Sequence, residues 1–338
     1  AQDQLGRLTV RALKERVEYE DIAFEHFMAS FAKPKQKQDI SEGVILYLHG
    51  GGYTAGGLDY CKAFGGVLAA AVGLPALCVA YRLAPEHRFP AALDDAVTAY
   101  DSLLIKGYAP ERIIVAGESA GGGLSFALGL RLRDEGKPLP AGFIGLSPWA
   151  DLSFTGKSYQ NNVRRDPTLR SEFLAYNVIM YAAGREDEAY VSPIFGDFHG
   201  FPPCLLFAGS EEILLDDALT LQKRLQESGA AAELIVEKGL WHVYPLYGLP
   251  ESRKAIARMV TPRRYMSKAY ASQVSGDIYG GDFRHRPELA AEFMRHVKWQ
   301  SRWGYYLQIA AATGWTSVHW LCRLKQRTLV MAGRDDPL

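Results

Sequence analysis

Short, uninterrupted apolar runs recur along the first 260 residues, and longer segments between them repeat apolar residues at helical spacing. A short apolar run rich in β-branched residues predicts a buried strand, whereas apolar residues three and four positions apart predict an amphipathic helix. The predicted strands are 44–48, 76–81, 112–116, 143–147, 203–209 and 232–236. The predicted helices are 58–72, 91–104, a segment that follows residue 120, 173–181, 218–228 and 249–259. This alternation predicts an α/β fold, with a mostly parallel sheet and helices on both of its faces.

Two segments depart from the alternation. The chain begins with a polar, helix-like lead at 5–16, followed by two strand-like runs, 17–24 and 26–31, that are close enough to form a hairpin. Residues 152–200 lose the regular pattern and carry one helix-like stretch. A long irregular insertion in such a fold is typical of a cap over the reactive site, so we expect a partly helical cap built from 1–16 and 152–200.

Ser119 stands between Gly117 and Gly121, at the point where a predicted strand passes into a predicted helix. This Gly-x-Ser-x-Gly pattern is typical of a nucleophile elbow, a turn so sharp that the flanking residues must lack bulk. The alternative is a serine that caps the helix in a glycine-rich chain. Glu118, beside the serine, is expected to bind backbone or arginine groups near the elbow.

A second glycine-rich turn, His49-Gly50-Gly51-Gly52, follows the strand 44–48 directly. Only glycine lets successive backbone N–H groups turn toward a ligand oxygen with no Cβ in the way, so this turn predicts an oxyanion loop. A phosphate-binding loop is the rival interpretation. The Lys-Ser/Thr pair of a P-loop is missing, however, and the glycine spacing does not fit a dinucleotide fingerprint.

A serine nucleophile requires a base within reach and a carboxylate that holds the base in the correct tautomer. His242 follows the last predicted strand, in a loop from which its side chain could reach Ser119. His49 is a poorer candidate, because its backbone is part of the glycine turn. The order of serine, then acid, then histidine is the one that α/β-hydrolases use. A purely structural role for His242 is the alternative.

Composition narrows the possible partners. Lysine plus arginine and aspartate plus glutamate both number 38, so no net charge attracts the chain to nucleic acid or to an anionic membrane. The four cysteines form no Cys-x-x-Cys pair, which favours reduced thiols in a cytoplasmic protein and argues against a zinc site. No apolar run approaches the roughly 18 residues of a membrane span. We therefore expect a small-molecule partner, with no cofactor and no metal.

Several motifs in the expected order give the segment from about 17 to 259 a family resemblance. They are His49-Gly-Gly-Gly52, Tyr81-Arg-Leu-Ala-Pro-Glu86, Gly117-Glu-Ser-Ala-Gly121 and Trp241-His242. With them the chain resembles the hormone-sensitive-lipase-like carboxylesterases, a bacterial family of α/β-hydrolases. The resemblance implies a cleavage of short- to medium-chain acyl esters through an acyl-enzyme. A lactonase, an amidase or a ligand-binding module on the same scaffold are the alternatives, and homo-oligomer formation stays open.

The resemblance also implies the site residues. Ser119 would be the nucleophile and His242 the general base, and the N–H groups of Gly51, Gly52 and Ala120 would form the oxyanion hole. The family's acid lies in an Asp-Pro-Leu-x-Asp-Glu pattern, and the matching position in this chain holds Glu212. Three neighbouring acids remain as alternatives: Glu211, Asp216 and Asp217.

Beyond residue 259 the chain changes character, which divides it into an esterase domain, 1–259, and an appendage, 260–338. Three motifs of the appendage resemble an α/β-hydrolase of the polyhydroxyalkanoate-depolymerase type: Thr261-Pro-Arg-Arg-Tyr265, Gly314-Trp-Thr-Ser317 and Ala332-Gly-Arg-Asp-Asp-Pro337. The segment has no elbow serine, and Asp336 is the one family catalytic position that it could carry. We expect a fused fragment without activity of its own, with packing on the esterase domain or self-association as alternatives.

Overall fold

A computed structural model describes residues 2–35 and 43–260 of the chain. Contacts between residues divide the chain into two units, 1–260 and 261–338, and the second unit lies outside the described residues. The predictions for the appendage and for Asp336 therefore concern a part of the chain that the structure does not describe.

The helices and strands of the described residues alternate along most of the chain. The strands are β1 (Val17–Ala23), β2 (Met28–Pro34), β3 (Val44–Leu48), β4 (Ala76–Ala80), β5 (Ile113–Glu118), β6 (Gly142–Leu146), β7 (Cys204–Gly209) and β8 (Ala232–Glu237). The α-helices are α1 (Gln2–Ala12), α2 (Leu58–Val72), α3 (Ala91–Ile105), α4 (Ala120–Asp134), α5 (Ser158–Asn161), α6 (Ser171–Tyr181), α7 (Leu215–Glu227) and α8 (Pro250–Val260). Three short 3-10 turns complete the set: η1 (Pro110–Arg112), η2 (Pro193–Phe195) and η3 (Tyr244–Tyr247).

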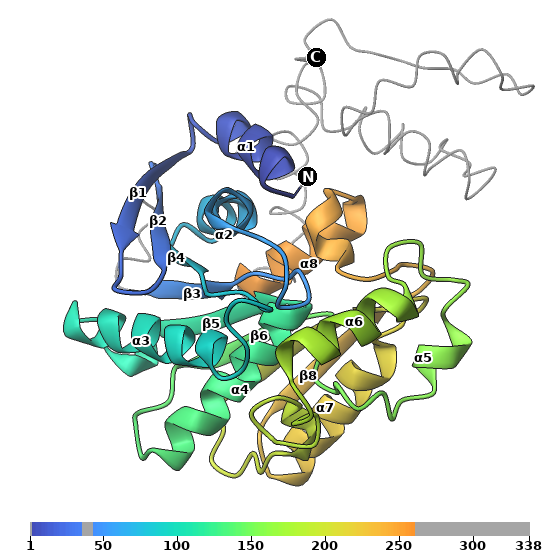
Figure 1. The fold of residues 1–338 in the computed structure, drawn as a ribbon. Coiled ribbons are helices and arrows are strands. Elements are labelled where there is room, and N and C mark those ends of the chain that lie inside the picture. The colour runs from blue at the N-terminus through green and yellow to red at the C-terminus, as the bar shows by residue number, and fades with distance from the viewer. Residues whose placement is uncertain (1, 36–42, 261–338) are drawn as a thin grey trace, which may run out of the picture. The chain divides into compact units, whose positions relative to one another are not determined.

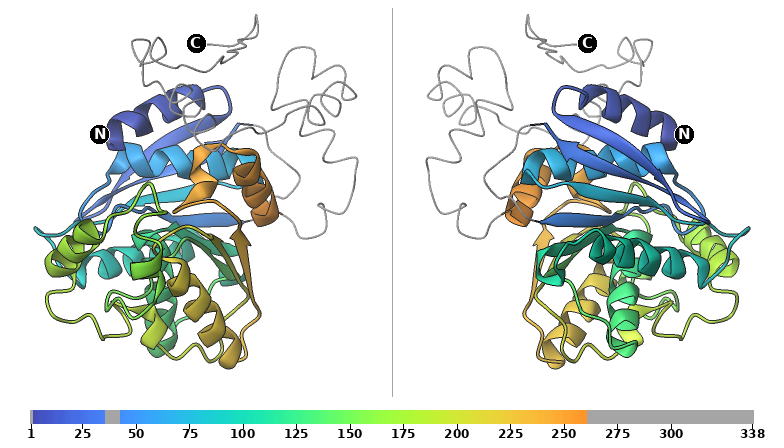
Figure 2. Two further views of the ribbon diagram at one scale, coloured as in Figure 1. Left: turned by 90° about the vertical axis from the view of Figure 1, so that its right-hand side faces the viewer. Right: turned by 90° about the vertical axis from the view of Figure 1, so that its left-hand side faces the viewer.

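All eight strands belong to one sheet, in the order β1-β2-β4-β3-β5-β6-β7-β8. The hairpin of β1 and β2 is antiparallel and pairs with β4 in the antiparallel sense, whereas all the other neighbours are parallel. Helices α2 and α8 lie on one face, and α3, α4 and α7 lie on the other (Figures 1 and 2). This is the mostly parallel sheet with helices on both faces that the sequence predicts.

The central strands are short and apolar because helices cover both of their faces. Every residue of β3 is buried, as is every residue of β5 except Ile114. Parallel strands covered on both sides cannot alternate between polar and apolar residues, which explains the continuous apolar runs. The centre of the sheet is therefore buried, and the two glycine-containing turns follow the carboxyl ends of its strands β3 and β5.

A few predicted boundaries differ from the structure. The first helix ends at Ala12 instead of 16, because hydrogen-bonded turns over residues 13–17 lead the chain into β1. The second strand of the hairpin runs from Met28 to Pro34, two to three residues later than the predicted 26–31. The region 152–200 contains α5, α6 and η2. No helix among the described residues is long and apolar enough to cross a membrane.

Candidate active site

Ser119 occupies a sharp turn between β5 and α4, with a φ of 55° and a ψ of −123°. A positive φ is costly for a serine and is found where the surrounding structure enforces it. A Cβ on Gly117 would lie 2.2 Å from the carbonyl oxygen of Gly121, and one on Gly121 would lie 2.1 Å from that of Leu48. The turn therefore tolerates only glycine on both sides of the serine.

The Ser119 side chain is the polar group that this turn leaves partly exposed. Ser119 is half-buried, whereas Glu118 and Ala120 on either side are buried. Its hydroxyl makes no hydrogen bond to the first turn of α4, which removes the interpretation of Ser119 as a helix cap. The hydroxyl is instead directed to a histidine.

His242 lies in the loop between β8 and η3, and it joins the serine to an acid. Its Nε2 is 2.9 Å from Ser119 Oγ, a hydrogen-bond distance. On the other side of the ring, Nδ1 is 3.5 Å from Glu212 Oε2. This second contact is an ion-pair distance, longer than a good hydrogen bond. The three side chains thus follow one another in contact as serine, histidine and acid, the arrangement that a hydrolytic triad needs.

Glu212 is fully buried and has few partners besides this imidazole. Neither carboxylate oxygen has a hydrogen-bond partner among the described residues. Burial raises the pKa of Glu212, while His242 and the hydroxyl of Ser147 act in the opposite direction. An imidazolium at His242 would therefore be the natural counter-charge of this carboxylate.

The three alternative acids have other partners. Glu211 faces Arg165, with 3.7 Å between its Oε2 and the guanidinium. Asp216 Oδ2 accepts a hydrogen bond from the backbone N–H of Ser158. Asp217 Oδ2 accepts bonds from two backbone N–H groups, of Ala150 and Asp151, and from the hydroxyl of Tyr159. Of the four candidate acids, only Glu212 is in ion-pair contact with His242.

The glycine turn after β3 adjoins the elbow because β3 and β5 are neighbours, with Leu48 paired to Gly117. Gly51 has a φ of +113° and Gly52 a φ of +64°, so both use the left-handed region that favours glycine. A Cβ on Gly51 would lie 2.1 Å from the carbonyl oxygen of Ala55. Ala120 begins α4, where backbone N–H groups have no partner within the helix. A Cβ on Gly50 would lie 3.1 Å from the Cβ of Ser119, so the glycine turn begins directly beside the elbow.

Glu118 connects the two turns. Its Oε1 accepts a 2.6 Å hydrogen bond from the N–H of Gly50, and its Oε2 accepts a 2.5 Å bond from the hydroxyl of Tyr47. The hydroxyl of Tyr60 lies 3.4 Å from Oε1. Burial raises the pKa of Glu118 to about 7 in spite of these donors. In residues 2–35 and 43–260 its hydrogen-bond partners are backbone and tyrosine groups, and none of them is an arginine.

Sequence reasoning missed the side chains that support the acid. Asn162 donates a 2.9 Å hydrogen bond to the carbonyl oxygen of Glu212, and Asp166 accepts a 3.0 Å bond from the N–H of Ile213. Ser147 Oγ accepts a 2.9 Å bond from the N–H of Val243, next to the histidine. A serine at the carboxyl end of a predicted strand was a usable signal for Ser147. The two residues of the insertion gave no such signal.

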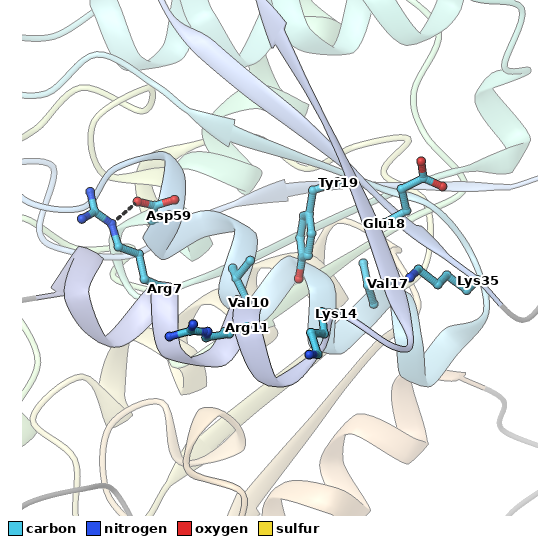
Figure 3. A pocket seen from close by; sticks show the side chains of 9 residues that line it. All are labelled: Arg7, Val10, Arg11, Lys14, Val17, Glu18, Tyr19, Lys35 and Asp59. Atoms are coloured by element: carbon cyan, nitrogen blue, oxygen red, sulfur yellow. Dashed lines mark hydrogen bonds and ion pairs between the residues drawn. The ribbon is translucent and has the colours of Figure 1, made fainter.

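Two further features of the described residues are their lack of a metal-ligand cluster and a cavity beside α1. No group of three or more His, Cys, Asp or Glu side chains in residues 2–35 and 43–260 could hold a metal ion. A separate cavity of about 610 Å³ lies between α1 and β1 (Figure 3). Its lining is mainly basic and apolar and includes no predicted site residue: Arg7, Val10, Arg11, Lys14, Val17, Glu18, Tyr19, Lys35 and Asp59.

The sheet, the elbow and the serine, histidine and glutamate contacts together define an α/β-hydrolase. A family model described as alpha/beta hydrolase fold matches residues 45–246, and the chain belongs to this family. An acetyl-hydrolase of Streptomyces hygroscopicus is 38% identical over 234 residues, which cover 68% of this chain and 77% of the relative. The structure also resembles a solved esterase of the bacterial hormone-sensitive lipase family, with a TM-score of 0.70 and 37% identity over 77% of this chain and 90% of that one. The predicted resemblance to this family is thereby confirmed.

A second kind of hydrolase matches part of the chain. A poly(3-hydroxyalkanoate) depolymerase of Ectopseudomonas oleovorans is 44% identical over 90 residues, which are 27% of this chain and 32% of the depolymerase. The predicted resemblance to this type is confirmed as a partial match. The chain covers about a third of that relative, so its activity does not carry over.

Proposed function

We propose that this chain is a serine carboxylesterase that hydrolyses short- to medium-chain acyl esters of small molecules. The observation that carries the proposal is the alignment of Ser119, His242 and Glu212, with 2.9 Å and 3.5 Å between successive side chains. Relatives named esterase and acetyl-hydrolase support the same reaction class.

The first half of the reaction forms an acyl-enzyme. His242 Nε2 takes the proton of the Ser119 hydroxyl while Oγ attacks the ester carbonyl. Glu212 stabilises the resulting imidazolium and keeps its Nδ1 proton on the side away from the serine. The imidazolium then gives its proton to the departing alcohol.

The negative charge of the tetrahedral intermediate falls on the former carbonyl oxygen. The backbone N–H groups of Gly51, Gly52 and Ala120 receive this oxyanion, and losing one such donor typically costs about 3 kcal/mol of transition-state stabilisation. In the second half of the reaction water attacks the acyl-enzyme with His242 again as base, which frees the acid and restores the serine.

Replacement of the nucleophile tests the proposal. Ser119→Ala should lower kcat on p-nitrophenyl butyrate by at least about 10³-fold, because the remaining groups cannot form an acyl-enzyme. The matched control is Ser102→Ala on α3, whose hydroxyl donates a 2.7 Å hydrogen bond to the carbonyl oxygen of Ala99. Circular dichroism of both variants checks the fold. Substantial turnover by Ser119→Ala would contradict the assignment.

Two alternatives share the scaffold and can be separated from the esterase. A lactonase or amidase would favour a lactone or an anilide over the matched ester in kcat/KM, whereas a binding module would give no acyl-enzyme burst with p-nitrophenyl acetate. We expect the burst, and we expect kcat/KM to fall from butyryl to palmitoyl esters.

The remaining parts of the proposal concern the surroundings of the enzyme. A cytoplasmic location is supported by the free thiols of Cys61, Cys78 and Cys204. The esterase segment is proposed to function as a domain, with α1 and the region 152–200 as parts of its cap. Formation of a homo-oligomer stays a prediction, which sedimentation of the purified chain would check.

A further inference from the structure

One polar side chain of helix α6 reaches the oxyanion loop. Asn177 lies in the middle of α6 and has no exposed surface. Its Oδ1 accepts a 2.8 Å hydrogen bond from the hydroxyl of Thr54, two residues beyond Gly52. The bond joins segments 123 residues apart in the sequence, so it links the inserted region to the loop that follows β3.

The amide of Asn177 also packs against Gly52 itself. A Cβ on Gly52 would lie 2.0 Å from Asn177 Nδ2 and 2.8 Å from its Cγ. The amide therefore fills the space directly beside the Gly52 α-carbon. Because Gly52 has a φ of +64°, its peptide groups have a conformation that other residues rarely adopt. A closely packed neighbour restricts the loop from relaxing away from this conformation.

Stability alone does not explain an amide at this position. Asn177 Nδ2 is buried and has no hydrogen-bond partner among the described residues. An unsatisfied buried donor costs about 1–3 kcal/mol, which an apolar side chain of similar size would avoid. The bond that Oδ1 accepts from Thr54 offsets part of this cost, so this bond and the contact with Gly52 are the features to test.

Helix α6 has a second contact with the same loop. The ring of Tyr181, at the end of α6, stacks on the ring of Tyr53 with 3.7 Å between centroids and 2° between planes. The helix thus contacts three consecutive loop residues: Gly52 and Thr54 through Asn177, and Tyr53 through Tyr181. Such a set of contacts fixes both the position and the rotation of the loop.

We propose that Asn177 is a positioning residue for the oxyanion hole, which it holds in register through Thr54 and Gly52. The inference rests on the proposed esterase function. The loop N–H groups act on charge that develops in the transition state, so a loosened loop should lower kcat while KM changes little. A residue that merely stabilises the cap would change the melting temperature or KM instead.

Four variants test the bond from both of its ends. We expect Asn177→Ala to lower kcat on p-nitrophenyl butyrate by about 10- to 100-fold, with KM within about threefold of the original value. Thr54→Val, which removes the hydroxyl at nearly constant volume, should lower kcat by about three- to tenfold, whereas Thr54→Ser should restore it. The double variant Thr54→Val/Asn177→Ala should match Asn177→Ala alone, because both changes break one bond.

The control is Val178→Ala, the buried neighbour on α6. This variant should lower the melting temperature and leave kcat within about twofold, since its cavity lies within apolar packing. If Asn177→Ala does not fold, the pair Thr54→Val and Thr54→Ser decides the question from the loop side.

The inference is overturned if both Asn177→Ala and Thr54→Val keep kcat within about threefold, if their effect is confined to KM, or if their losses multiply in the double variant. The proposed function fails separately. In that case the unchanged protein is inactive on esters, or Ser119→Ala is as active as the unchanged protein. An active enzyme with a dead Ser119→Ala variant and normal Asn177 variants would overturn only the present inference.

Discussion

Two buried glutamates adjoin the site, one next to Ser119 in the sequence and one in contact with His242, and their surroundings differ sharply. Glu118 receives hydrogen bonds from the N–H of Gly50 and from the hydroxyls of two tyrosines. Glu212 has no hydrogen-bond partner among the described residues and faces His242 at 3.5 Å. Both carboxyl groups have a pKa raised by burial. The same desolvation therefore acts on two groups with different partners.

The difference indicates two different roles. A carboxylate whose oxygens are saturated by fixed donors holds those donors in place, and Glu118 thereby ties the oxyanion loop to the elbow. A carboxylate with few fixed donors is costly to bury, and an imidazolium opposite it would lower that cost at the moment when His242 takes the serine proton. Glu118 would thus maintain geometry, whereas Glu212 would respond to the reaction.

The largest expected effect comes from neutralising the glutamate that faces the histidine. Glu212→Gln should lower kcat by about 10³- to 10⁴-fold, because an amide in that place neither stabilises the imidazolium nor fixes the tautomer. Steady-state kinetics on p-nitrophenyl butyrate measure the loss. The matched control is Glu211→Gln, one residue earlier and paired with Arg165, which should stay within about threefold of the original kcat. A larger loss in Glu211→Gln than in Glu212→Gln would reassign the acid.

The next effect concerns the loop that Glu118 holds. Gly52→Ala should lower kcat by about 100-fold or more, because the new Cβ would lie 2.0 Å from Asn177 Nδ2 and must displace either the loop or α6. Gly107→Ala is the control. Gly107 also has a positive φ, of +91°, but no atom lies within 4 Å of an added Cβ. It should lose about 1–2 kcal/mol of stability and keep its kcat. Equal kcat losses in both variants would mean that backbone strain, and not the contact, decides activity.

The parts of the site that the sequence predicts are those set by local backbone geometry. Gly51 and Gly52 have left-handed φ values, and the backbone approaches closely around Ser119. Only glycine fits such positions, so the glycines of the sequence indicate these turns. Strand ends in a parallel sheet then bring the two turns to the same place.

The parts that the sequence did not predict depend on contacts between distant segments. Asn177 and Thr54 are 123 residues apart, and Asn162 and Glu212 are 50 residues apart. No local sequence pattern therefore predicts that either pair is in contact. The partners of Glu118 illustrate an intermediate case. Its position beside the serine indicated a bond to nearby backbone, and that bond goes to Gly50, but nothing in the sequence indicated the hydroxyl of Tyr47.

The smallest expected effect is on stability and not on activity, and it concerns the pH dependence that Glu118 gives to the free energy of unfolding. The folded protein raises the pKa of Glu118 from 4.5 to about 7. Between these values the folded state keeps a proton that the unfolded state has released, so the free energy of unfolding falls as pH rises through this window. Glutamine does not titrate. The stability of Glu118→Gln relative to the unchanged protein should therefore increase by about 2 to 3 kcal/mol between pH 5 and pH 8.

Urea denaturation of both proteins at the two pH values measures this difference, in which the contributions of all other titrating groups cancel to first order. The amide oxygen of Glu118→Gln can still accept the N–H of Gly50, and its NH₂ group can donate to Tyr47, so kcat should stay within about threefold. Relative stability that is the same at both pH values would mean that Glu118 is charged throughout, held by its donors alone. The pKa of Glu118 would then not be raised by burial, and the two glutamates would differ in pKa as well as in their hydrogen-bond partners.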